Sequence, residues 1–294
     1  MMASGELLQW HAADGLMPAQ VFIPRTPTAE PRRPLLVFLH GGGDVGFPQM
    51  SGQSLPHLLQ SNETFRQNFP FIGLFPCSTC STPERGWVPG NLARVSMLIA
   101  RLIKEHHADP HRVVLTGQTM GGAGVWRYAA ANPHIFSALV PVSASLNPTR
   151  GLIEASCCPE GPSAGCCPPV WVFHVAKDAA VPVRYAEDTV RMLKDQSGDR
   201  QVRYTRLSSS GVPQHTSCYE YAYRETQLYD WLLQQRCATC HGPGHTFNRT
   251  RHSPTHPPHP PPYASQRNGA HRFDMAQPHS MPIVRTGHEE DSAF

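Results

Sequence analysis

The chain has 294 residues and a formal net charge of only +3 at pH 7. This length is enough for one large α/β domain with a full core, or for two small domains. Because the charge is small and the arginines are scattered along the sequence, we expect neither a nucleic-acid partner nor binding to a charged membrane surface.

The sequence shows no targeting signal. The sequence has no apolar run of about 18 residues, so we expect no membrane span. The N-terminal segment MMASGELLQWHAADG has neither a basic nor an apolar part of the kind found in secretory signals, and we expect a cytoplasmic protein. In that setting the nine cysteines are predicted to be reduced thiols. The alternative for the adjacent pairs Cys157-Cys158 and Cys166-Cys167 is a disulfide within the loop or a site for a soft metal.

The predicted strands begin with a β-hairpin over residues 7–24, in which Asp14-Gly15 is the turn signal. The strands that follow are continuous apolar runs, as expected in a parallel sheet that is covered on both faces. They are predicted at 35–39, 71–75, 113–116, 138–142 and 170–175, with a more polar one at 201–207.

Helical patterns lie between these strands. In residues 91–107 the apolar side chains recur at spacings of three and four, which places them on one helix face. Further helices are predicted at 121–132, 184–195 and 223–235. Strands that alternate with helices in this way predict an α/β fold with a mostly parallel, doubly wound sheet.

Two segments lack any regular pattern. Residues 148–169 form an irregular Cys/Pro-rich insertion between two predicted core strands, and residues 238–294 are rich in proline and histidine. The second segment has too few apolar residues to offset the entropy of ordering, so we predict a disordered tail. The predicted layout is therefore a folded domain over 1–237 and a tail over 238–294.

The most informative motif is Gly117-Gln-Thr-Met-Gly121, which follows a predicted strand and precedes a predicted helix. This is the setting of a nucleophile elbow, a turn so tight that glycine is needed two residues before and after the nucleophile. Thr119 occupies the nucleophile position. The backbone N–H of Met120, at the start of the helix, is predicted to face a developing oxyanion.

A second motif, His40-Gly-Gly-Gly43, directly follows the strand at 35–39. A glycine-rich loop there lets a backbone N–H approach a substrate oxygen closely, although it can also be a simple strand-to-helix turn. Together the two motifs predict an oxyanion hole formed by Met120, Gly41 and Gly42. Substrate contacts are predicted for three side chains near them: His40, Gln118 and Trp87.

A base and an orienting acid are expected after the nucleophile, in the order acid and then histidine. Asp178 lies just past the strand at 170–175, and His215 lies between the last strand and the last helix. The alternative for Asp178 is a loop cap, and the alternative for His215 is an ordinary surface histidine. The predicted catalytic residues are thus Thr119, Asp178 and His215.

These motifs resemble those of a known family. Residues 109–122, DPHRVVLTGQTMGG, resemble the Asp-Pro-x-Arg-Val-Tyr-Leu-Thr-Gly-x-Ser-Met-Gly-Gly segment of the phospholipase/carboxylesterase-like "predicted peptidase" group of α/β-hydrolases. That group is related to feruloyl esterases and polyhydroxybutyrate depolymerases. Residues 34–43, 170–183 and 228–233 resemble its oxyanion, acid and C-terminal helix segments. The resemblance covers roughly residues 10–235.

The resemblance implies an α/β-hydrolase fold and cleavage of a small-molecule ester through an acyl-enzyme, without a cofactor or a metal. By position it makes Thr119 the nucleophile, His215 the base and Asp178 the orienting acid. Two departures stand out. Threonine replaces serine, and the family's glycine directly before the histidine is replaced by a longer loop, Gly211-Val-Pro-Gln-His215.

Threonine changes what can be expected of the site. It carries the required hydroxyl, but a β-branched residue is disfavoured in the positive-φ backbone of an elbow, which already costs about 1–3 kcal/mol. The alternative to a working esterase is therefore a pseudoenzyme that uses the hydrolase pocket for binding. The sequence makes no prediction of the oligomeric state.

A third class of function concerns the end of the predicted domain. Cys237-Ala-Thr-Cys240-His241 matches a haem-attachment motif formally, and with His245 the same segment offers four possible zinc ligands. Haem attachment takes place in oxidising compartments, which the predicted location does not provide. We therefore expect a solvated helix end that runs into the histidine-rich tail.

Overall fold

The computed structural model describes most of the region predicted to fold. The described residues are 5, 7–10, 16–25, 30–42, 54–78, 86–157, 167–196, 201–208, 215–237 and 243. The predicted turn at Asp14-Gly15, the middle of the insertion at 158–166 and, apart from residue 243, the tail at 238–294 lie outside them.

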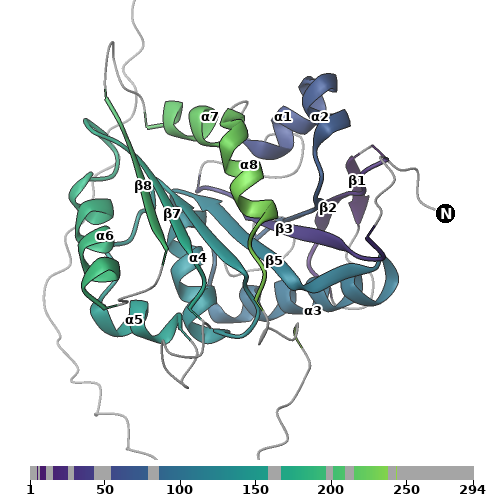
Figure 1. Ribbon diagram of the computed structural model, residues 1–294, viewed down its shortest axis with the longest axis horizontal. Helices are drawn as coiled ribbons and strands as arrows, with labels where there is room; N and C mark the ends of the chain where they lie inside the picture. The colour runs from purple at the N-terminus through teal and green to yellow at the C-terminus, as the bar shows by residue number, and fades with distance from the viewer. Residues whose placement is uncertain are drawn as a thin grey trace, which may run out of the picture. The chain divides into compact units, whose positions relative to one another are not determined.

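Within the described residues the centre of the fold is an eight-stranded sheet (Figure 1), with strand order β1-β2-β4-β3-β5-β6-β7-β8. The strands β4, β3, β5, β6, β7 and β8 run parallel to one another, whereas β2 pairs antiparallel with both β1 and β4. The strands are β1 (Leu7–Trp10), β2 (Ala19–Phe22), β3 (Arg33–Leu39), β4 (Ile72–Pro76), β5 (Ala108–Gln118), β6 (Ala138–Val142), β7 (Val170–Val175) and β8 (Val202–Leu207).

The apolar strands are buried on both faces of the sheet because successive side chains point in opposite directions. In β3, Leu35 and Val37 belong to one hydrophobic cluster, while Leu36 and Phe38 belong to another on the opposite face. The first cluster is covered by α3, α4, α5 and α6, and the second by α1, α7 and α8. Figure 1 shows these two helical layers on either side of the sheet. The predicted doubly wound arrangement is confirmed.

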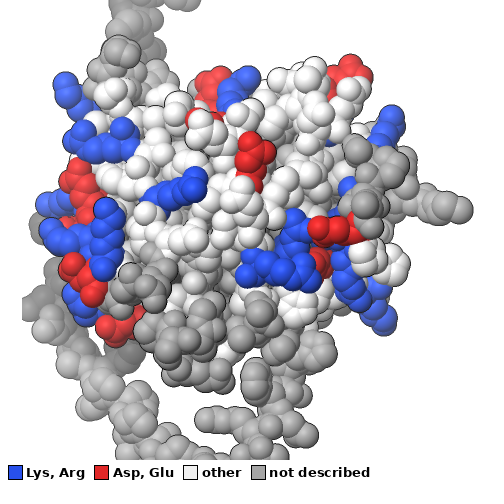
Figure 2. All heavy atoms as spheres, in the orientation of Figure 1, with Lys and Arg blue, Asp and Glu red and all other residues white. Residues whose placement is uncertain are grey.

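The helices are α1 (Leu55–Ser61), α2 (Glu63–Asn68), α3 (Pro89–Glu105), α4 (Met120–Ala131), α5 (Arg150–Ala155), α6 (Arg184–Gln196), α7 (Ser217–Arg224) and α8 (Thr226–Leu233). None of the described helices has the length and the hydropathy of a membrane span. On the face seen in Figure 2, positive and negative side chains lie among one another near the edges, and a broad area between them carries little charge.

Two predicted segments differ from the structure. The helix predicted at 223–235 is α8, and α7 directly before it was not predicted. The two are separate helices because Glu225 is extended, and its side chain accepts a hydrogen bond from the backbone N–H of Gln227 to start α8. The insertion at 148–169, predicted to be irregular, contains α5 in its first part. There the hydroxyl of Thr149 accepts a hydrogen bond from the Leu152 N–H and caps the helix.

The prediction of reduced thiols is wrong for the insertion. Cys157 and Cys167 form a disulfide, with their Cα atoms 4.3 Å apart. Cys77 and Cys237 are also disulfide-bonded, whereas Cys218 is a buried free thiol. The end of α5 and the start of β7 come together in the fold, a proximity that a ten-residue spacing in the sequence does not reveal. Disulfides persist in oxidising compartments, so this bonding disagrees with the reducing location from which the prediction started.

Candidate functional site

The three predicted catalytic residues follow strands that end at the same edge of the sheet. Thr119 follows β5, Asp178 follows β7, and His215 lies between β8 and α7. Because β5, β7 and β8 belong to the parallel part of the sheet, their carboxyl ends point the same way, and ligands of open α/β sheets bind outside such ends. The topology therefore places all three residues at one edge.

The backbone of Thr119 has the geometry of a tight elbow. Its φ is 46° and its ψ is −107°, an unusual conformation for a β-branched residue. The Thr119 N–H donates to the carbonyl of Val142 in β6, and the Thr119 carbonyl accepts from the N–H groups of Ala123 and Ser145, each at 3.0 Å. Three hydrogen bonds thus hold a strained residue in place between β5 and α4.

Two glycines make this turn possible. A Cβ atom on Gly121 would lie 1.8 Å from the carbonyl oxygen of Leu39, and one on Gly117 would lie 2.5 Å from the carbonyl oxygen of Gly121. The predicted need for glycine at both positions is confirmed. The elbow is consequently packed against the end of β3. This brings Met120 beside the glycine-rich loop, where its Sδ is 3.9 Å from the position of a Cβ on Gly42.

Asp178 and His215 form a short hydrogen bond. The His215 Nδ1 and the Asp178 Oδ2 are 2.6 Å apart, and the Asp178 side chain is fully shielded from solvent. The second oxygen, Oδ1, accepts the backbone N–H groups of Ala180 and Val181 at 2.9 Å each. Burial alone raises the pKa of this carboxyl, but the hydrogen bonds from His215 and Val181 outweigh it and hold the pKa below its ordinary value of 3.8. Asp178 is therefore an ionised acceptor for His215.

This pairing defines how His215 can act. Its Nδ1 carries a proton and donates it to Asp178, so in the neutral ring Nε2 is the free base. His215 is 16% exposed, and its ring lies edge-on against Tyr219 of α7. In the described part of the chain His215 and the Thr119 hydroxyl are not hydrogen-bonded to each other. Contacts between catalytic groups are often long before a substrate binds.

The glycine-rich loop is held by His40, which is buried beneath it at 1% exposure. The backbone N–H of Ser78 donates to the His40 Nε2 at 3.1 Å, so that nitrogen carries no proton. The proton is therefore on Nδ1, which donates to the Gly41 carbonyl at 2.8 Å. Because the C=O and N–H of one peptide plane point in opposite directions, the Gly42 N–H is directed away from the His40 ring.

The side chains predicted to contact substrate are buried. His40, Gln118 and Trp87 are each 1% exposed, and the Trp87 Nε1–H donates to the His40 carbonyl at 2.9 Å. Their positions suit support of the loop and the elbow. Ser78 adds to this support, since both its backbone N–H and its hydroxyl lie 3.1 Å from the His40 Nε2. No sequence motif singles out this serine.

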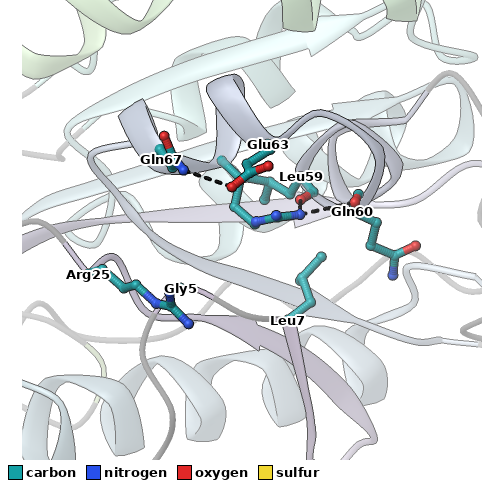
Figure 3. Close-up of a pocket in the computed structure, with 8 residues that line it drawn as sticks. Gly5, Leu7, Arg25, Leu59, Gln60, Glu63 and Gln67 are labelled. Atoms are coloured by element: carbon teal, nitrogen blue, oxygen red, sulfur yellow. Dashed lines mark hydrogen bonds between the residues drawn. The ribbon is translucent and has the colours of Figure 1, made fainter.

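A large cavity lies elsewhere in the molecule (Figure 3). It has a volume of about 750 Å³ and is lined by residues of α1, α2 and the N-terminal strands, and none of the three predicted catalytic residues reaches it. The Arg66 guanidinium donates there to the carbonyls of Leu59 and Gln60, and Gln67 donates to Glu63. These polar groups serve α1 and α2, so we place no reaction in this cavity.

The C-terminal cysteine motif is only partly described. Cys237 is disulfide-bonded, so its own sulfur is not a free thiol for haem attachment or for binding zinc. Cys240, His241 and His245 lie outside the described residues. Among the residues that the structure does describe, no group of three histidine, cysteine or acidic side chains is arranged to hold a metal ion.

No protein-family model matches the chain, and no curated protein matches it. Solved structures do. A thermostable esterase superposes with a TM-score of 0.61 and 25% identity, over 78% of this chain and 63% of that one. FphF, a fluorophosphonate-binding serine hydrolase of Staphylococcus aureus, superposes with a TM-score of 0.54 and 13% identity, over 78% of this chain and 97% of that one. Esterase 2 of Thermogutta terrifontis superposes with a TM-score of 0.50 and 16% identity, over 79% of this chain and 92% of that one.

These neighbours are esterases and serine hydrolases, and two of the three are well below 25% identical to this chain, so they inform on the fold alone. With the strand order described above, they establish that the chain has the α/β-hydrolase fold. The chain spans 63% of the length of the thermostable esterase.

Proposed function

We propose that the chain hydrolyses carboxylic esters through an acyl-enzyme, with a Thr119–His215–Asp178 triad. The observation that carries the proposal is the 2.6 Å hydrogen bond between His215 and a shielded, ionised Asp178, at the sheet edge where Thr119 forms the elbow. A catalytic base needs this hydrogen bond, because the acid fixes the tautomer and stabilises the imidazolium that forms during the reaction.

In the proposed reaction His215 Nε2 removes the proton of the Thr119 hydroxyl as its oxygen attacks the ester carbonyl. The backbone N–H of Met120 and an N–H of Gly41 or Gly42 stabilise the oxyanion. The imidazolium then protonates the leaving alcohol, and the acyl group stays on Thr119 Oγ1. Water, activated by the same histidine, releases the acid and restores the hydroxyl. These residues suffice for the chemistry without a cofactor.

Resemblance to the phospholipase/carboxylesterase-like group supports the same assignment, and solved esterases share the fold. On this basis the substrate is a small-molecule ester, and the catalytic domain extends over residues 1–237. His40, Gln118 and Trp87 are then supports of the oxyanion loop and the elbow, because their side chains are buried.

A second candidate is a binding protein that keeps the hydrolase pocket without turnover. The observation in its favour is Thr119 itself, a β-branched residue at a φ of 46°. Its methyl group limits the χ1 rotamers available to the hydroxyl. A displacement of the attacking hydroxyl by about 1 Å can lower the rate about a hundredfold. The choice between the two candidates therefore depends on whether Thr119 can place its hydroxyl for attack.

The experiment is hydrolysis of short-chain p-nitrophenyl esters by wild type, Thr119→Ala and Thr119→Ser, each verified as folded. We expect wild type to turn over, the alanine variant to fall to background, and the serine variant to exceed wild-type kcat by at least about tenfold, since serine lacks the methyl group. Turnover by the serine variant alone would establish the binding protein instead. Equal turnover by all three would remove Thr119 from the mechanism.

A further inference from the structure

His174 is a polar residue within the buried strand β7, whose other members are apolar. It is 1% exposed. Its Nε2 lies 3.1 Å from the carbonyl oxygen of Val181 and 3.5 Å from Oδ2 of Asp178. A carbonyl oxygen can only accept, so the proton of the neutral ring is on Nε2, and His174 is the donor.

This hydrogen bond closes a small ring of contacts around the catalytic acid. Asp178 Oδ1 accepts the N–H groups of Ala180 and Val181, and His174 binds the carbonyl of the same Val181. The turn from Asp178 to Val181 is therefore held by two sets of hydrogen bonds. Its N–H groups donate to the Asp178 carboxylate, and its Val181 carbonyl accepts from His174 of β7. With Oδ1 fixed in this way, Oδ2 is left to face His215.

The surroundings keep His174 uncharged. Burial lowers its pKa, against the opposing effects of the Val181 carbonyl and of Asp178. The titratable and charged groups that face it are Asp178 and His215 beyond the strand end, Tyr185 and Glu187 of α6, and Arg206, its register partner in β8. Arg206 and Glu187 form an ion pair with each other at 3.1 Å. His174 thus presents a neutral Nε2–H donor toward Asp178.

We propose that His174 is a positioning residue of the triad, which holds the Asp178–Val181 turn through the Val181 carbonyl and thereby aims Oδ2 of Asp178 at His215. The inference rests on the proposed function wherever its test uses turnover. The sequence offers one signal for this role: a histidine four residues before the predicted acid, inside a strand that is otherwise apolar.

The test compares His174→Phe, which keeps a ring but loses the donor, with His174→Gln, whose side-chain amide can donate from a similar position. Val172→Ala is the matched control. Val172 lies in the same strand as His174 and lines the same small cavity, but its side chain makes no hydrogen bond to the Val181 carbonyl. We expect the phenylalanine variant to lose about a hundredfold in kcat with little change in KM, and the glutamine variant to recover most of it.

The split between kcat and KM separates positioning from general damage. A badly aimed carboxylate orients the His215 ring less well, which slows the chemical step but leaves the binding of substrate unchanged. The loss is therefore expected in kcat alone for the phenylalanine variant, and kcat is expected to stay near the wild-type value in the glutamine and Val172→Ala variants. Wild-type kcat in the phenylalanine variant would overturn the proposal. Equal losses in all three variants would overturn it too.

A measurement that does not need turnover keeps the two proposals apart. The proton in the short His215 Nδ1–H···Asp178 hydrogen bond is expected to give a low-field NMR resonance, assigned by its absence in Asp178→Asn. We expect this resonance in wild type and His174→Gln, and its loss or upfield shift in His174→Phe. If wild type hydrolyses no ester but the resonance behaves in this way, the proposed function fails and the positioning role stands. An unchanged resonance in His174→Phe contradicts the positioning role.

Discussion

Replacing Asp178 with asparagine is expected to lower kcat about a thousandfold or more, with little change in KM. The amide oxygen can still accept the N–H groups of Ala180 and Val181. The amide nitrogen then faces the His215 Nδ1 and can only donate to it. His215 is thereby driven into the tautomer with its proton on Nε2, which cannot accept a proton from Thr119.

The matched control is Asp188→Asn in α6. Like Asp178, Asp188 is a hydrogen-bonded carboxylate, and its partners are Arg191 and Asn147. Its side chain, however, is 30% exposed and lies on a surface helix. We expect this variant to keep wild-type kinetics. An Asp178→Asn enzyme that retains more than about a tenth of the wild-type kcat would show that the acid has been assigned to the wrong residue.

The same substitution has a consequence for stability that depends on pH. The pKa of Asp178 is lowered in the folded protein, so its ionised form stabilises the fold at pH values above its ordinary pKa of 3.8. This contribution is lost as the pH falls below 3.8 and through the lowered pKa. Urea unfolding of wild type and Asp178→Asn should therefore show a stability difference at neutral pH that shrinks in this acidic range.

The largest effect on stability is expected at Gly121. An alanine there would place its Cβ atom 1.8 Å from the Leu39 carbonyl oxygen and 2.8 Å from that of His40, both backbone atoms. No side-chain rotation relieves this overlap, so either β3 or the elbow must move. We expect Gly121→Ala to lower the free energy of unfolding by more than about 3 kcal/mol, or to prevent folding altogether.

Gly151→Ala provides the comparison. Gly151 is a helical glycine in α5, and a Cβ atom added to it would have no neighbour within 4 Å. Because alanine is the better helix former, we expect this variant to be up to about 1 kcal/mol more stable than wild type. Urea unfolding of the two variants checks both expectations. Comparable stability for them would mean that the elbow is not packed against β3 as described.

The fold could be predicted where the sequence pattern and the buried surface coincide. The strands at 138–142 and 170–175 have the predicted bounds, because both are buried on both faces and are apolar throughout, except for His174 in the second. The elbow could be predicted because Gly117 and Gly121 are required by a local steric conflict. The pairing of Asp178 with His215 followed from their places after neighbouring strands, which a parallel sheet brings to one edge.

What could not be predicted depends on contacts between distant residues. The disulfide of Cys157 with Cys167 requires α5 and β7 to meet. The hydrogen bonding of His40 depends on Ser78, which lies two residues past the end of β4, the strand next to β3. The two short helices α1 and α2 contain six or seven residues each and escape a periodicity test. Such features arise from packing, and no local sequence pattern predicts them.

The measurement that tests the central claim most directly is the site of covalent labelling by a fluorophosphonate. A hydroxyl activated by His215 attacks the phosphorus and displaces fluoride, which leaves a stable phosphonyl group on the nucleophile. Peptide mass spectrometry of labelled wild type is expected to place the adduct on Thr119, with no labelling of Thr119→Ala or of heat-denatured protein. An adduct on a different residue, or wild type that stays unlabelled while Thr119→Ser is modified, would contradict the claim that Thr119 is a working nucleophile.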